Sequence, residues 1–88
     1  MNLQEEAEHA VITALAQKQP LALELLEFFA KQHFEQKNLP LGNSFTKTLD
    51  GVILYLCARE LIAFSSEGEA SIYGLTHDGL AYFQRLRR

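Results

Sequence analysis

The chain has 88 residues, of which 48% are hydrophobic and 22% charged, and its formal net charge is -3. This length supports one domain with a single core and excludes a second domain, and the mild acidity argues against a general polyanion binder, because such proteins carry an excess of basic residues. The single cysteine, the acidic N-terminus and the lack of an apolar run near the roughly 20 residues that cross a bilayer predict a cytoplasmic protein with no disulfide and no membrane contact.

Two helices are predicted in the first part of the chain. Residues 3–17 place small and aliphatic side chains at intervals of three and four along one face, and Asn2 can cap the first turn together with Glu5. Pro20 suits the first position of a second helix, which is expected to run to Lys37. This second helix is apolar on more than one face, so it is expected to lie centrally or to touch a second subunit.

A loop over residues 38–44 precedes a third predicted helix, which Ser44 can cap and which ends near Glu60. The residues expected on its apolar face are Phe45, Leu49, Val52, Ile53 and Leu56, and those expected to point elsewhere are Thr46, Lys47, Asp50 and Leu54. Gly51 lies in the middle of this helix, where glycine costs about 1 kcal/mol relative to alanine. We expect it to allow a close approach of another helix.

The last third of the chain predicts a β-hairpin and a fourth helix. Two short apolar runs flank residues 66–69, and Gly68 can supply the positive φ of the turn. Thr76 can then cap a helix. The apolar residues of that helix are Leu80, Phe83 and Leu86. The expected fold class is therefore mainly α with a small β-hairpin (α+β), and the fourth helix is expected to pack over the hairpin and the first helix.

This order of elements resembles the winged helix-turn-helix family. The stretch ELIAFSSEGEASIYGLTHDGL carries the resemblance, because its final part is similar to the aromatic-x-Leu-Thr-x-x-Gly phrase found where strand meets helix in many bacterial winged-helix regulators. The resemblance implies a single winged-helix domain over residues 1–88. It also implies that the third helix enters the major groove of DNA and that the wing reaches a phosphate or the minor groove.

The resemblance also implies a set of contact residues. Those expected near the DNA groove are Asn43, Ser44, Thr46, Lys47 and Asp50, with Lys37 added if a dimer gathers basic residues on one surface, and those at the wing tip are Ser66, Glu67 and Glu69. The charges of this surface disfavour phosphate contact, because the wing tip is acidic and the third helix offers one lysine. A solvated wing and a helix whose polar residues merely face water remain the alternative.

Two functions follow as hypotheses. The first is a small DNA-binding transcriptional regulator, expected to be a homodimer because a palindromic DNA site matches two-fold symmetry. Its dimer contacts are expected at Ile12, Leu23 and Phe28. The second is an acidic winged-helix interaction module or inhibitor, which docks on a basic protein partner and does not bind double-stranded DNA.

Catalysis is not expected from this sequence. His9, His33 and His77 have no second ligand three or four residues further along the chain, so no helical metal pair or zinc-finger spacing exists. Cys57 lies in an apolar helix, where a free cysteine acts as a small hydrophobic residue. No glycine-rich phosphate loop is present. We therefore expect no enzyme activity, no metal and no cofactor.

Overall fold

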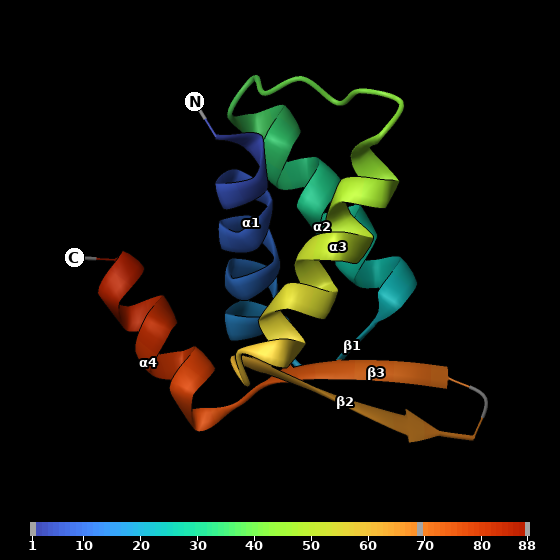
Figure 1. Ribbon diagram of the computed structural model, residues 1–88, viewed down its shortest axis with the longest axis vertical. Helices are drawn as coiled ribbons and strands as arrows, with labels where there is room; N and C mark the ends of the chain where they lie inside the picture. The colour runs from blue at the N-terminus through green and yellow to red at the C-terminus, as the bar shows by residue number, and fades with distance from the viewer. Residues whose placement is uncertain (1, 69, 88) are drawn as a thin grey trace.

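A computed structural model describes residues 2–68 and 70–87. Within these residues the helices are α1 (Leu3–Lys18), α2 (Leu23–Gln36), α3 (Phe45–Ala58) and α4 (His77–Leu86), and the strands are β1 (Leu21–Ala22), β2 (Ile62–Glu67) and β3 (Ala70–Leu75). Figure 1 shows α1, α2 and α3 grouped above a small sheet, with α4 beside α1. The described part of the chain is therefore mainly helical with a small antiparallel sheet, the α+β class that the sequence predicts.

Helix α1 occupies the centre of the core. Its start is fixed as predicted, because the Asn2 Oδ1 atom accepts a hydrogen bond of 3.2 Å from the Glu5 N–H. The helix packs against α2, α3, α4 and β3, so its buried surface is wider than one stripe. The sequence placed Ile12 off that stripe and at a dimer interface. This prediction is wrong, because Ile12 is fully buried within the subunit and has no surface to offer a second copy.

The second helix begins later than predicted, because a short strand precedes it. Leu21 and Ala22 form β1 and pair with Tyr73 and Ile72 of β3, so Pro20 is not the first residue of a helix. The sheet order is β1-β3-β2, and the expected hairpin is the larger part of a three-stranded sheet. A two-residue strand has no periodicity of its own. Its pairing partner in β3 lies about fifty residues away, so no local sequence pattern predicts the strand.

Helix α3 buries the face that the sequence predicts. The residues on that face, all buried, are Phe45, Leu49, Val52, Ile53 and Leu56. Ser44 is the N-cap residue as expected, although its side chain makes no capping hydrogen bond. The expectation for Gly51 is wrong within the subunit. Gly51 is exposed and a Cβ at this position would meet nothing within 4 Å, so no other described helix approaches it.

The hairpin forms as predicted, with Gly68 at a φ of 63° in the turn. Phe64 of β2 lies opposite Tyr73 of β3, and their ring centroids are 5.5 Å apart. Side chains alternate between the two faces of a strand, so Phe64 lies on the same face as the buried Ile62. The two aromatic rings therefore extend the apolar face of the sheet beyond the buried core.

A compact joint connects the sheet to α4. The Thr76 N–H donates to the Leu61 carbonyl at 3.1 Å, and the Thr76 Oγ1 atom donates to the Glu60 carbonyl while accepting from the Gly79 N–H at 3.0 Å. Gly79 is buried directly against Leu61, where an added Cβ would overlap the carbonyl oxygen. The Leu-Thr-x-x-Gly phrase therefore has a structural role: it fixes the direction in which α4 leaves β3.

Helix α4 packs against α1 and the end of β3, as the sequence predicts. Its inward face differs from the predicted one by about one position. Leu80 is 43% exposed, whereas the half-buried apolar residues are Tyr82, Phe83 and Leu86. The close approach at Gly79 turns the helix so that Leu80 faces outward.

Candidate functional site

The outer side of α3 carries a stripe of residues that face solvent. Successive residues of a helix are rotated by about 100°, so positions 47, 51, 54 and 58 share one side, opposite the buried Leu56. These residues are Lys47, Gly51, Leu54 and Ala58, and all of them are exposed. Leu54 is 72% exposed, the largest value among the exposed large apolar side chains of the described residues. A single exposed leucine is common on soluble proteins, so Leu54 is informative only together with the apolar surface beside it.

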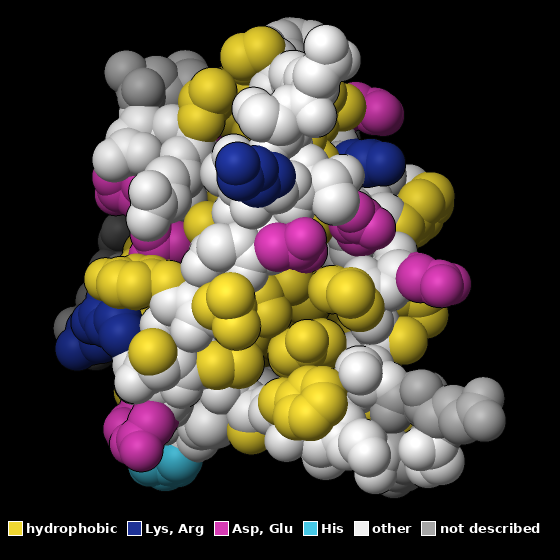
Figure 2. Space-filling model, turned by 45° about the vertical axis from the view of Figure 1, so that its right-hand side comes forward, with side chains coloured by type: hydrophobic (Ala, Val, Ile, Leu, Met, Phe, Trp, Pro, Cys, Tyr) yellow, Lys and Arg dark blue, Asp and Glu magenta, His cyan; other side chains and the backbone are white. Residues whose placement is uncertain are grey.

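A groove of about 300 Å³ lies beside this stripe. We call it the α3 groove and define it by its lining residues, which are Leu23, Asp50, Ile53, Leu54 and Tyr73. It lies where α3 faces the start of α2 and the strand β3. Figure 2 shows hydrophobic side chains gathered on this side of the molecule, with carboxylates at the border of the patch. The groove can accept an apolar side chain from another molecule.

Aromatic residues extend the apolar surface around the groove. Phe64 is 54% exposed and lies against Tyr73, which lines the groove. Partial burial raises the pKa of the Tyr73 phenol, and the nearby Cys57 and Asp50 act in the same direction, so this hydroxyl stays neutral. Among the lining residues Asp50 is the charged one, and none is basic. The α3 groove is therefore apolar with one carboxylate.

The structure brings five of the six predicted DNA contacts together. Asn43 and Ser44 are exposed in the turn before α3, and Thr46, Lys47 and Asp50 are exposed along its first two turns. Lys37 belongs to a different surface, because it ends α2 and lines a cleft between α1, α2 and α4. Lys47 is thus the single basic residue of the predicted set on α3.

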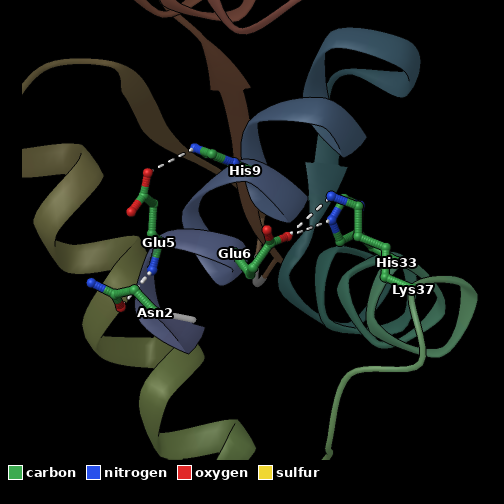
Figure 3. A network of polar contacts seen from close by, with 6 residues as sticks. All are labelled: Asn2, Glu5, Glu6, His9, His33 and Lys37. Atoms are coloured by element: carbon green, nitrogen blue, oxygen red, sulfur yellow. Dashed lines mark hydrogen bonds and ion pairs between the residues drawn. The ribbon is translucent and has the colours of Figure 1, made fainter.

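The Lys37 ammonium is held by a carboxylate of α1 (Figure 3). Its Nζ atom donates to the Glu6 Oε2 atom at 3.3 Å, and the His33 Nε2 atom lies 3.4 Å from the same oxygen. Partial burial acts to raise the pKa of the Glu6 carboxyl. The hydrogen bonds from Lys37 and His33 and the charges of Lys37 and His9 outweigh burial, so this pKa lies below its ordinary value of 4.5.

This network predicts a pH-dependent contribution to stability. A carboxyl group whose pKa is lowered by folding stabilises the folded state above its unfolded pKa, and that contribution is lost as the pH falls through the folded value. We expect Glu6→Gln to lower the free energy of unfolding by about 0.5–1 kcal/mol at pH 7, because Lys37 is half-exposed and the ion pair is partly screened. The difference from the wild type should shrink below pH 4.5.

Urea unfolding at pH 7 and at about pH 3 measures this difference. Glu5→Gln serves as the control, because the exposed Glu5 makes a longer contact of 3.9 Å with His9. A difference between Glu6→Gln and the wild type that stays constant down to about pH 3 would show that the carboxylate charge is not what joins the two helices.

The other predicted contacts are distributed as follows. Ser66 is exposed in β2, whereas Glu69 and the side chain of Glu67 lie outside the described part of the structure. Of the predicted dimer contacts, Phe28 is exposed on α2 and Leu23 lines the α3 groove. Leu23, predicted as a dimer contact, therefore lies beside Asp50, predicted as a DNA contact. The sequence did not predict that these two residues share a surface.

Within residues 2–68 and 70–87, no group of three or more His, Cys, Asp or Glu side chains is arranged to hold a metal ion. Partial burial raises the pKa of the Cys57 thiol, which disfavours the reactive thiolate. None of the helices among these residues has the length and apolar character needed to traverse a bilayer.

Sequence reasoning missed the α3 groove, although one signal for it was present. Leu54 is apolar but lies out of phase with the buried stripe of its helix, and this mismatch can be read from spacing alone. The contributions of Leu23 and Tyr73 could not be found, because they depend on the pairing of β1 with β3.

Comparison with known proteins adds no assignment: no model of a protein family matches the chain, and no curated protein matches it significantly.

Proposed function

We propose that this chain is a winged-helix interaction module that binds a protein through the α3 groove. The observation that carries the proposal is the 72% exposure of Leu54 beside an apolar groove. A helix that reads DNA presents polar and basic side chains to base edges and phosphates. An outward leucine and a neighbouring carboxylate suit a protein surface better.

The winged-helix part of this proposal is supported by element order and by one junction. Three helices are followed by a hairpin and a closing helix, the order on which the resemblance rests. Thr76 and Gly79, two residues of the phrase that carries the resemblance, make the joint between β3 and α4. Because Thr76 and Gly79 have a specific structural role, they support a winged-helix fold more strongly than a similar amino-acid composition would.

The protein-binding part is supported by the chemistry of the surface. Protein interfaces combine an apolar centre, often with aromatic residues, and a polar rim. Here Leu54, Tyr73 and Phe64 supply apolar and aromatic area, and Lys47 and Asp50 lie at the edge. A contiguous apolar surface of this kind on a small protein marks an interaction site more often than an accident of packing.

Quantitative capture of proteins from a cell extract tests the proposal. We expect proteins bound by the wild type to be lost by Leu54→Asp, because a carboxylate in the centre of an apolar contact must be desolvated. Leu80→Asp is the matched control, since Leu80 is also an exposed leucine but lies on α4. When the wild type captures proteins, equal losses for both variants, or no loss for Leu54→Asp, would contradict binding at the α3 groove.

A DNA-binding regulator is the second candidate function. It is favoured by the N-terminal part of α3, where Asn43, Ser44, Thr46 and Lys47 are exposed together. Its weakness is the scarcity of positive charge, because phosphate contacts supply most of the affinity of such proteins.

A further inference from the structure

The exposed stripe of α3 has the shape of a self-complementary contact. Leu54 projects from it, and Gly51, one turn earlier, has no side chain and open space around it. Glycine in mid-helix weakens the helix, and no element in the described part of the chain approaches Gly51. When two identical helices pack against each other, the Leu54 side chain of each can fill the open space at Gly51 of the other.

We propose that the partner of this surface is a second copy of the chain, bound by antiparallel packing of α3 against α3. This inference rests on the proposed function, because it names the occupant of the same surface. A two-fold axis between positions 52 and 53 places Leu54 of each copy over Gly51 of the other. The absence of a side chain at Gly51 lets the two helices approach closely.

The same register is favourable for the charged and polar residues. It sets Lys47 opposite Ala58, the last residue of α3 and two positions before Glu60. A lysine there meets both the negative end of the helix dipole and a carboxylate. This contact occurs twice in the dimer, so the basic start of the stripe on each copy meets the negative end of α3 on the other.

A stable interface requires more surface than the outer side of α3 alone. A standard interface buries roughly 800 Å² on each partner, about a seventh of the 5756 Å² of accessible surface of the chain. The face extends from the start of α2 across α3 to the hairpin, through Leu23, Leu54, Phe64 and Tyr73. Association of two such faces would cover the large apolar side chains that the single subunit leaves exposed around α3.

Analytical ultracentrifugation of the wild type from about 1 μM to about 1 mM tests the inference. We expect a reversible dimer in this range. Gly51→Gln, which fills the notch, and Leu54→Asp, which places a charge in the contact, should each raise the dissociation constant about tenfold or more. Leu80→Asp, on the remote surface of α4, should leave it unchanged.

Urea unfolding of the dilute variants separates binding from folding. Gly51→Gln should unfold at an equal or higher urea concentration than the wild type, because glutamine favours a helix more than glycine does. Weaker association of a variant that is no less stable would be hard to explain without a direct contact at Gly51. A wild type that stays monomeric at about 1 mM, or a dimer that tolerates both Gly51→Gln and Leu54→Asp, would overturn the inference.

The capture experiment distinguishes this failure from failure of the proposed function. A monomeric wild type whose bound proteins are lost by Leu54→Asp would overturn the second copy as the partner and retain the α3 groove as a protein-binding surface. In that case Asp50 would favour a partner that offers a basic group beside its apolar side chain. A monomer with no such loss would overturn both.

Discussion

Gly79→Ala is expected to lower the free energy of unfolding by about 3 kcal/mol. The added Cβ would overlap the carbonyl oxygen of Leu61, which is backbone and already accepts a hydrogen bond from the Thr76 N–H. Relief of the overlap would move α4 away from Leu61 and strain the bond from the Gly79 N–H to the Thr76 side chain. Urea unfolding monitored by circular dichroism measures the change.

Gly51→Ala is the matched control for this prediction. Both glycines lie in helices, but a Cβ at Gly51 meets nothing within 4 Å. Alanine should therefore raise the free energy of unfolding of the dilute subunit by about 0.5–1 kcal/mol. A neutral or stabilising effect of Gly79→Ala in the same assay would contradict the close contact between Gly79 and the Leu61 carbonyl.

The second large effect is expected within α3. Leu56→Ala should lower the free energy of unfolding by about 2–5 kcal/mol, because Leu56 is fully buried in the core. Leu54→Ala, two residues away on the same helix, should change it by no more than about 0.5 kcal/mol, because Leu54 is largely exposed.

This pair of leucines tests the orientation of α3 directly. The two substitutions remove the same atoms from the same helix and differ only in the side of α3 that they affect. Equal destabilisation by both would mean that Leu54 is packed inside the subunit. The α3 groove, the proposed function and the second copy would then lose their common basis.

The helices could be predicted from the sequence because their signals are local. The cap at Asn2, the buried stripe of α3 and the cap at Thr76 each depend on residues within a few positions of one another. The hairpin was predictable for the same reason, since Gly68 separates two runs of similar length.

The features that escaped prediction depend on distant parts of the chain. The strand β1 exists because residues 21 and 22 meet β3. Ile12 is buried because α1 is covered on several sides by elements far away in sequence. Lys37 is separated from Lys47 because it ends α2, which packs on α1 and places Lys37 beside Glu6, 31 positions away in sequence.

The candidate surface combines both kinds of information. The outward position of Leu54 follows from helical spacing, and the sequence did predict that it points away from the apolar face. Its neighbours Leu23 and Tyr73 come from other elements, so the groove itself required the structure. The acidity of this surface could be predicted from the sequence, but the apolar groove beside Asp50 could not.

The most direct test of the central claim, that the outer face of α3 binds protein and not DNA, is fluorescence anisotropy with a labelled mixed-sequence duplex. Non-specific DNA binding is strongest at low salt, and each phosphate neutralised adds about 0.9 to the logarithmic salt slope. We predict no binding at about 20 mM salt, because Lys47 is the lone basic side chain among the exposed residues of α3. Binding that weakens steeply with salt and is reduced by Lys47→Ala would contradict the claim and favour the DNA-binding regulator.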